Sequence, residues 1–525
     1  MKGQPHGLTL VASAVSLALL VLPFALYIRT LAPTITWQHD GYDAGDLITA
    51  AYTLGIPHPT GYPLYTLLGK LFTLLPFGDV AYRMNMMSAF CAALTAPLLY
   101  WTSLTLLRSR PYAILASACA ALLLSTSRVL WSQAVITEVY TLNCLFFATI
   151  LYLVLRLQPL LSGSFEQVVE RTRIVRIMML IALIYGLSLG NHLTMLLTAP
   201  LLFYQCMIAS RLCTLRTLEW ARVLGMFLLG LSVYIYLPLR AGSQPLLNWG
   251  NPGTLRGFVW VVSGSIYRQY VFALPLGYWP ERLLAWAGLL RQQFGTWGTA
   301  LGLLGAWKQA KRSWQLFGIL VLTSVLFSTY AIGYNTTDSY VYLLPVYFLY
   351  ALWIAEAVQT ALSTLPKTQG TWSKRAAVLS GLALLALPLG SLRANLQVLD
   401  LSNDYTAHHY GSQVFAQVPD GSIIISATDA HTFTLWYFAR VVTGRTTVAL
   451  IDEDLLGYHW YVDGLREAYP WLDLSPTSMG IPLTVDDLIQ ANIQRHPIFL
   501  TDVDSDLIAH YRLQEQGALY QLLAR

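Results

Sequence analysis

The chain has 525 residues, of which 55% are hydrophobic and only 11% are charged. Soluble globular proteins carry about a quarter charged residues, so this composition excludes an ordinary soluble enzyme and predicts a polytopic membrane protein. The formal net charge of +5 is unevenly distributed, since 16 of the 27 acidic residues but only six of the 32 Lys and Arg lie from residue 394 onward. A basic membrane part with an acidic tail argues against nucleic acid as a partner.

Eleven apolar segments of roughly spanning length precede residue 394. They lie at residues 8–30, 82–107, 111–127, 134–156, 175–189, 193–210, 220–239, 294–307, 314–333, 340–362 and 376–393. The first segment lacks a clear small-x-small cleavage site, so we expect a retained helix rather than a cleaved signal peptide. The predicted fold class is therefore a polytopic α-helical membrane protein with about 11 transmembrane helices.

Basic residues fall in every second loop between these segments, for example Arg108 and Arg110, then Arg171 and Arg173, and later Lys367. Because cytoplasmic loops carry the excess of Lys and Arg, the N-terminus is predicted to be cytoplasmic in a multi-pass protein of the cell membrane. The tail after residue 393 then lies on the extracytoplasmic side. The carboxylates of the first loop and the long loop 240–280 lie at the same outer face.

The first outer loop reads DGYDAGDLITAAYTLGIPHPTGYP over residues 40–63 and places three carboxylates, Asp40, Asp43 and Asp46, at intervals of three. Asp43 and Asp46 suit the N-cap and third position of a helix, as in a capping box. A carboxylate there could instead be a general base that deprotonates an acceptor hydroxyl. The two roles are compatible, because capping holds a carboxylate in place.

The turn that follows, IPHPTGYP at residues 56–63, contains His58 and Tyr62. Three prolines fix its backbone, so it is predicted to be rigid and non-helical. It could be a simple connector between two helices. An imidazole beside carboxylates could also bind a phosphate or orient a base.

Polar residues at the outer ends of four other segments complete the candidate site. Glu138 begins a spanning helix, Asn191 and His192 break two apolar runs, Arg240 opens the long outer loop, and Asp338 lies in a polar hairpin. Each has a plain structural interpretation: headgroup contact, a tight turn, a snorkelling anchor or a loop. Ionisable residues at membrane depth nevertheless suggest function, and Arg240 could attract an anionic group.

The acidic tail, residues 394–525, is predicted to be a small α/β domain beside a membrane domain of residues 1–393. Short β-branched runs lie at residues 422–426, 447–451 and 497–501, and helical patterns lie at about 430–441, 458–469 and 484–495. This alternation favours a small parallel sheet. The sequence has no GxGxxG or P-loop pattern, so nothing in it supports a nucleotide site.

In their order along the chain, these blocks resemble a family of membrane proteins once catalogued as a domain of unknown function and now grouped with protein O-mannosyltransferase-like enzymes. The resemblance spans nearly the whole chain. It is carried by DAGD at 43–46, LGIPHPTGYPLY at 54–65, PFGDVAYRMNMMSA at 76–89, WSQAVITEVYTLN at 131–143, GLSLGNH at 186–192, YLPLRA at 236–241, NWGNP at 248–252 and DAHTFTLWY at 429–437.

The resemblance implies a GT-C glycosyltransferase, which takes a sugar, with a mannose-like hexose the leading expectation, from a polyprenyl-phosphate carrier at the outer membrane face. An acidic residue of the first outer loop is then the catalytic base, which points to Asp43 first and Asp46 second. Asp46 stands where the family often has Glu, so the choice between the two stays open.

The chemistry that fits this reading is an inverting displacement in which His58 or Arg240 balances the charge of the leaving phosphate. The remaining expected donor-binding residues are Tyr62, Glu138, Asn191, His192 and Asp338. No cofactor is expected, and a divalent metal is possible but not indicated.

Two alternatives remain. A transporter or flippase of a lipid-linked sugar would place carboxylates near the bilayer midplane, whereas here they cluster at one face, which favours the enzyme. A non-catalytic scaffold would keep the fold without the chemistry. The sequence leaves the acceptor open between protein, glycan and lipid.

Overall fold

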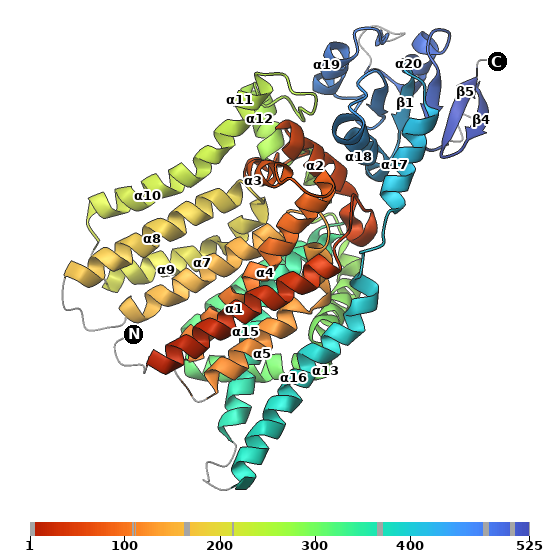
Figure 1. The fold of residues 1–525 in the computed structure, drawn as a ribbon. Coiled ribbons are helices and arrows are strands. Elements are labelled where there is room, and N and C mark those ends of the chain that lie inside the picture. Colours follow the sequence, from red (N-terminus) through yellow and green to blue (C-terminus); the bar gives the residue numbers. More distant parts are fainter. Residues whose placement is uncertain are drawn as a thin grey trace.

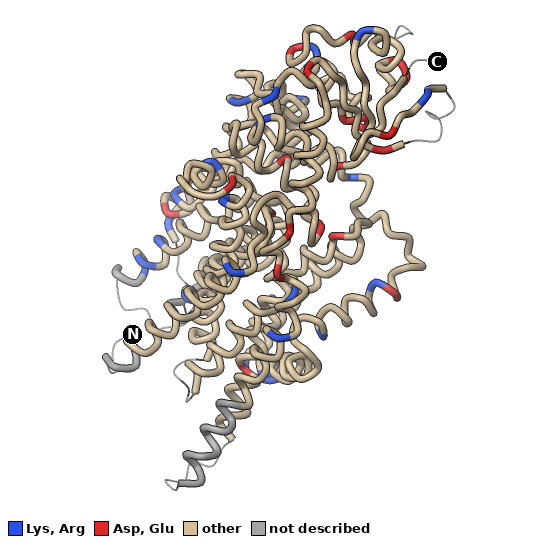
Figure 2. The backbone as a smooth tube through the Cα atoms, turned by 45° about the vertical axis from the view of Figure 1, so that its right-hand side comes forward, with Lys and Arg blue, Asp and Glu red and all other residues tan. Residues whose placement is uncertain are grey.

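A computed structural model describes residues 6–107, 110, 112–161, 168–212, 215–364, 371–475, 482–503 and 510–523. Arg108 and Lys367 of the predicted basic loops lie outside these residues. The described chain forms a helical bundle with an α/β part at one end of it (Figure 1). Figure 2 shows that long stretches of the bundle carry no Lys, Arg, Asp or Glu, as the composition predicts.

Among the described residues, eight helices are long and apolar enough to cross a membrane, or nine if a bent pair counts as one span. The bent pair is α5 (Ala113–Ser125) and α6 (Arg128–Ala134), which meet at 61°. The eight are α1 (His6–Arg29), α4 (Val80–Leu107), α7 (Tyr140–Leu161), α8 (Val168–Leu189), η2 with α9 (Leu193–Thr198, Ala199–Leu212), α10 with η3 and α11 (Thr217–Leu231, Ser232–Ile235, Tyr236–Ala241), α14 (Trp314–Gly333), and η6 with α15 (Ser339–Leu343, Leu344–Ser363).

These helices confirm the predicted class of polytopic helical membrane protein. The two other predicted segments, 294–307 and 376–393, lie in α13 (Trp279–Arg312) and α16 (Thr371–Leu399). In α16 the structure contains a shorter apolar stretch, Ala383–Leu399.

The helices differ in how deeply the protein covers them. In the Ser339–Ser363 span, 94% of the apolar window is buried inside the protein, against 11% in the Thr217–Ala241 span. Helix α15 is therefore the centre of the bundle, whereas α10 presents its apolar side chains outward, where lipid would satisfy them.

Short elements at one end of the bundle carry the loops that the sequence singled out. They are η1 (Gln38–Asp43), α2 (Ala44–Thr53), α3 (Pro63–Thr73), α12 (Leu255–Val262), η4 (Ser265–Tyr270) and η5 (Leu276–Tyr278). Ile56 pairs with Asn248 in an isolated parallel bridge, which ties the first outer loop to the long loop after α11.

The α/β part contains a five-stranded sheet in the order β2-β1-β3-β5-β4. Its strands are β1 (Ile423–Ser426), β2 (Ala449–Asp452), β3 (Ile498–Leu500), β4 (Arg512–Gln516) and β5 (Leu519–Leu523). Its helices are α17 (Thr406–Gln417), α18 (Asp429–Tyr437) continued by η7 (Phe438–Val442), α19 (His459–Ala468) and α20 (Val485–Asn492).

The three predicted strands and three predicted helices of the tail are confirmed, and β1, β2 and β3 pair in parallel. The prediction of a purely parallel sheet is incomplete, because β4 and β5 add an antiparallel hairpin. The predicted domain boundary at residue 394 falls within α16 and stays a prediction.

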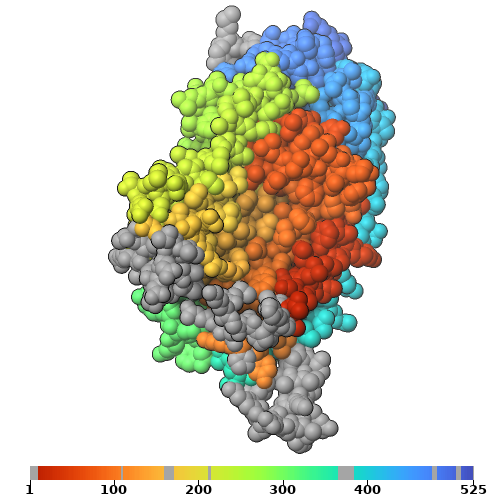
Figure 3. Space-filling model, turned by 60° about the vertical axis from the view of Figure 1, so that its left-hand side comes forward, coloured from red at the N-terminus to blue at the C-terminus, as the bar shows by residue number. Residues whose placement is uncertain are grey.

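The α/β part docks on the first outer loop through α18, and Figure 3 shows it covering that end of the molecule beside the orange N-terminal elements. The Trp37 indole N–H lies 3.1 Å from the Ala430 carbonyl oxygen and 2.9 Å from the Thr434 hydroxyl. The Tyr437 hydroxyl donates to Asp79. A Cβ on Gly45 would lie 2.1 Å from the Phe433 carbonyl oxygen, so only glycine permits this approach of α18 to α2.

Candidate active site

Asp46 is the buried centre of the candidate site. It lies in the first turn of α2 with 0% exposed area, and one carboxylate oxygen accepts the His58 backbone N–H at 2.9 Å and contacts His58 Nδ1 at 2.7 Å. The other oxygen accepts the Trp249 indole N–H at 3.1 Å. These three contacts satisfy a carboxylate that burial would otherwise strongly disfavour.

Asp43 occupies the N-cap position of α2, as predicted, but its side chain makes no capping hydrogen bond. The predicted capping box is therefore wrong, because the Asp46 carboxylate is engaged by His58 and Trp249 instead. The Asp43 side chain is 36% exposed, and one of its carboxylate oxygens lies 3.6 Å from His58 Nε2. The His58 imidazole thus lies between the fully buried Asp46 carboxylate and the partly exposed Asp43 carboxylate.

The charges of this triad are coupled through His58. Burial lowers the pKa of the His58 imidazole, but the Asp43 and Asp46 carboxylates raise it by more, so that His58 is a cation at neutral pH. Burial raises the pKa of the Asp43 carboxyl above its usual value, an effect that the His58 cation opposes and Asp429 reinforces. Asp43 is consequently a better proton acceptor than an ordinary aspartate.

Asp43 and His58 open into a cavity of about 510 Å³, which we call the carboxylate cavity. Elements at the end of the bundle where the α/β part docks line it: η1, the 56–63 turn, the start of α7, η2, η4, the end of α14, η6 and α18. Its polar and aromatic lining includes Asp40, Asp43, His58, Tyr62, Tyr140, His192, Tyr267, Arg268, Tyr270, Tyr330, Tyr334, Asp338, Tyr342 and Asp429.

Five predicted site residues meet in this cavity: Asp43, His58, Tyr62, His192 and Asp338. The His192 ring nitrogen Nδ1 lies 2.8 Å from the Thr194 hydroxyl, and burial together with the His58 charge lowers the pKa of His192 to about 4. His192 is therefore a neutral imidazole, unlike His58. Burial raises the pKa of Asp338.

Besides Asp46, three other predicted residues lie outside the cavity lining. The Glu138 side chain is buried and accepts the Val139 backbone N–H at 3.2 Å, and Asn191 donates to the Val139 carbonyl at 3.2 Å, so both fix the turn before α7. Arg240 donates to the Leu54 carbonyl at 2.6 Å and thereby caps the C-terminal end of α2. Among the described residues, the arginine that lines the cavity is the exposed Arg268 instead.

Asp429 was missed by the sequence analysis as a site residue. It lies in the first turn of α18, and burial raises its pKa while the His58 cation lowers it. The sequence feature that could have indicated Asp429 is its position at the start of DAHTFTLWY, a block of the tail that carries the family resemblance. The sequence alone does not indicate that Asp429 reaches the same cavity as Asp43, because this depends on the docking of α18 on α2.

No group of three or more His, Cys, Asp or Glu side chains in the described part of the chain is arranged to hold a metal ion. The expectation that the protein needs no cofactor stays a prediction.

Two family models match the chain. The N-terminal domain of protein O-mannosyl-transferase TMEM260 matches residues 43–213, and TMEM260-associated domain 2 matches residues 407–501. Protein O-mannosyl-transferase TMEM260 of Mus musculus is 28% identical over 476 residues, covering 86% of this chain and 64% of the relative. The Dictyostelium discoideum protein of the same name is 22% identical over 529 residues, covering 90% and 62%. The chain thus spans less than two thirds of the length of these relatives.

Solved structures show the same fold. ArnT from Cupriavidus metallidurans, bound to undecaprenyl phosphate, superposes with a TM-score of 0.56 at 11% identity, over 99% of this chain and 98% of ArnT. The oligosaccharyltransferase AglB from Archaeoglobus fulgidus, in complex with an inhibitory peptide and a dolichol phosphate, gives 0.51 at 11% identity, over 86% and 68%. The bundle with the α/β part at one end is therefore a GT-C fold.

The geometry predicts that Asp46 stabilises the fold more than Asp43 does. In Asp46→Asn, the new amide N–H₂ faces donors of His58 or Trp249, so we expect a loss of about 2 kcal/mol in the free energy of unfolding. Asp43→Asn removes only a 3.6 Å contact, and we expect less than about 1 kcal/mol. Thermal unfolding in mild detergent, followed by tryptophan fluorescence, measures the difference. Equal losses in both variants would contradict these roles.

Proposed function

The chain belongs to the protein O-mannosyltransferase-like family of GT-C membrane proteins, and we propose that it is a glycosyltransferase that moves a sugar from a polyprenyl-phosphate carrier to an acceptor hydroxyl. The observation that carries this proposal is the open Asp43 carboxylate, held against His58 in a cavity that both the bundle and the α/β part line.

In the proposed reaction, Asp43 accepts the proton of the acceptor hydroxyl. The acceptor oxygen attacks the anomeric carbon, and the bond between that carbon and the phosphate oxygen breaks, so the electron pair leaves with the polyprenyl phosphate. A single displacement of this kind inverts the anomeric centre. His58 holds Asp43 in place and balances its charge, and Asp46 holds His58 through two contacts.

The donor phosphate fits the side of the cavity where Arg268 lies, because Arg268 and His58 supply the positive charge that stabilises the leaving group. This replaces the sequence-based proposal of Arg240, whose guanidinium is engaged by the carbonyls of α2. Undecaprenyl phosphate bound to the structural relative ArnT supports a carrier of this chemical class.

The isoprenoid tail would leave through the leucine-lined edge of the carboxylate cavity. Leu193, Leu196 and Leu197 of η2 line this edge, and Leu196 is 51% exposed. These residues begin the Leu193–Ser210 helix, which is apolar and long enough to cross a membrane. An opening of the carboxylate cavity at this edge would face lipid, where a hydrocarbon chain is most stable.

The sugar would lie against the tyrosine-rich wall opposite Asp43. Tyr267, Tyr334 and Tyr342 offer ring faces and hydroxyls, and Asp338 offers a carboxylate for sugar hydroxyls. The names of the relatives make a mannose-like hexose the leading candidate. A protein acceptor is the matching proposal, and it would approach past Asp429.

We place the cavity and the α/β part at the extracytoplasmic face of the cell membrane, with the N-terminus in the cytoplasm. The alternation of basic loops supports this orientation.

A topology reporter tests the orientation. An alkaline phosphatase fused after Arg525 is expected to be active, because this enzyme requires export, whereas green fluorescent protein at the same position is expected to be dark. The same pair fused after Ser313, between α13 and α14, should give the opposite result and serves as the control. A fluorescent C-terminal fusion would contradict the outward placement of the site.

The role of Asp43 is tested by turnover of the purified protein with a short-chain polyprenyl-phosphate hexose. Asp43→Asn is expected to lower kcat at least about 100-fold while donor binding is retained, since a positioned general base contributes about 10²–10⁴-fold. Asp486→Asn, on the surface of α20, should keep the wild-type rate. Full activity in Asp43→Asn would remove it from catalysis, and tight donor binding without turnover in any variant would favour the transporter.

The pH dependence of kcat gives an independent check. Asp43 accepts a proton only when ionised, so the rate should rise with increasing pH, with a midpoint above the usual value of about 3.8 for an aspartate. The upward shift reflects burial of the carboxylate. A rate that is already at its plateau at pH 4 would contradict Asp43 as the base.

A further inference from the structure

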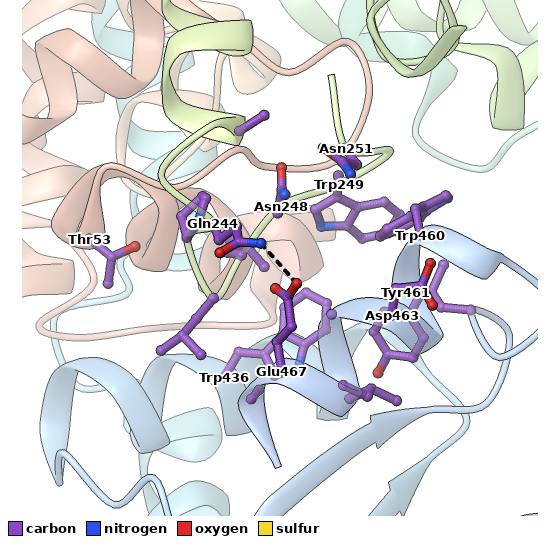
Figure 4. A pocket seen from close by; sticks show the side chains of 18 of the residues that line it. Thr53, Gln244, Asn248, Trp249, Asn251, Trp436, Trp460, Tyr461, Asp463 and Glu467 are labelled. Carbon is purple, nitrogen blue, oxygen red and sulfur yellow. Dashed lines mark hydrogen bonds between the residues drawn. The ribbon is translucent and has the colours of Figure 1, made fainter. Parts of the chain in front are cut away.

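A second cavity lies on the other side of the Asp46 carboxylate, between the loop after α11 and the α/β part. Its volume is about 580 Å³, and we call it the aromatic cavity. Figure 4 shows the Trp249 and Trp460 rings on one side and the Gln244–Glu467 pair across from them. The labelled lining comprises Thr53, Gln244, Asn248, Trp249, Asn251, Trp436, Trp460, Tyr461, Asp463 and Glu467.

Tryptophan rings dominate one wall of the aromatic cavity. The Trp249 ring centroid lies 5.7 Å from that of Trp460 and 6.2 Å from that of Trp436. The face of an aromatic ring carries partial negative charge, which attracts polarised C–H groups. A pyranose presents such C–H groups on one face and hydroxyls around its edge, so ring platforms of this kind match it.

The polar side chains that line the aromatic cavity match the hydroxyl groups around the edge of a pyranose. Asn248 Oδ1, Trp460 Nε1 and Arg440 Nη1 are buried atoms that make no hydrogen bond within the described part of the chain. Buried polar atoms in proteins are nearly always paired, so these three have capacity for a ligand. One of them is an acceptor and two are donors. A sugar hydroxyl can donate to the acceptor and accept from the donors.

The polar groups of the lining exclude one other ligand class. The Arg440 guanidinium donates to the Tyr469 hydroxyl at 2.7 Å, and the two carboxylates of the lining, Asp463 and Glu467, accept from Arg466 and Gln244. A hydrocarbon tail is disfavoured, because an apolar ligand would leave the three buried unpaired atoms without partners.

We propose that the aromatic cavity is a carbohydrate-binding site that takes neutral hexopyranose units of a glycan. It is separate from the carboxylate cavity, where the donor sugar would react. Trp249 connects the two, since its ring lines the aromatic cavity and its N–H holds Asp46. The proposal does not rest on the transferase reaction, because binding needs neither the donor nor Asp43.

Saturation-transfer NMR on the purified full chain tests the site, with methyl α-D-mannopyranoside and a mannobiose as probes and myo-inositol as the polyol control. All measurements use the Asp43→Asn background without donor, so that they are independent of turnover. We expect saturation of the sugar C–H protons and at least a fivefold weaker signal with myo-inositol, which lacks the ring oxygen and glycosidic carbon.

Trp460→Ala should reduce the sugar signal at least fivefold, whereas Trp460→Phe should restore most of it and so exclude misfolding as the cause. Trp471→Ala is the matched control in the α/β part, since Trp471 packs on His496 at 4.6 Å and lines neither cavity. Tyr267→Ala, in the carboxylate cavity where the donor sugar would lie, should reduce the signal less than Trp460→Ala does. An undiminished signal in Trp460→Ala, or a signal lost only in Tyr267→Ala, would overturn the proposal.

Discussion

The hydrogen bonding of one buried carboxylate organises the end of the bundle on which the α/β part docks. Asp46 has no exposed area, and a charge in that position is stable only when donors surround it. Its donors come from the 56–63 turn and from Trp249 of the long outer loop. Two neighbouring segments of the first loop and a third about 200 residues away are thereby held in one arrangement, in which His58 faces Asp43.

The two aspartates show how environment divides chemically identical groups. Asp46 is fully buried with both oxygens engaged, whereas Asp43 makes one long contact with His58 and opens into a cavity. Burial of a carboxylate raises its basicity, and the neighbouring cation keeps it ionised. Of the two, only Asp43 also reaches a cavity, as a group that accepts a proton from a bound molecule must.

The sequence was sufficient to predict the membrane class, the acidic first loop and the three parallel strands, because each depends on local composition or periodicity. It could not separate Asp43 from Asp46, since their spacing of three residues is equally suited to a capping box. The burial of Asp46 as a hydrogen-bonded carboxylate depends on Trp249, which lies about 200 residues away in the sequence. The β4–β5 hairpin was missed because RLQEQ, over residues 512–516, is polar and mostly exposed.

Two further residues show the same dependence on tertiary contacts. Arg240 looked like an anion site because it was predicted to lie at the outer face, yet its guanidinium donates to the carbonyls at the end of α2. Asp429 lies almost 400 residues after Asp43 and reaches it only because Gly45 lets α18 pack closely on α2. Neither outcome follows from charge or hydropathy along the chain.

The position of α18 has a consequence for biosynthesis. The carboxylate cavity draws its lining from residue 40 at one extreme and from Asp429 at the other, so a growing chain carries Asp43 and His58 long before the last wall exists. Until α18 has been made and has packed against α2, the wall that Asp429 contributes is missing. The complete lining of the carboxylate cavity therefore exists only after the C-terminal part of the chain has been made and has folded onto the bundle.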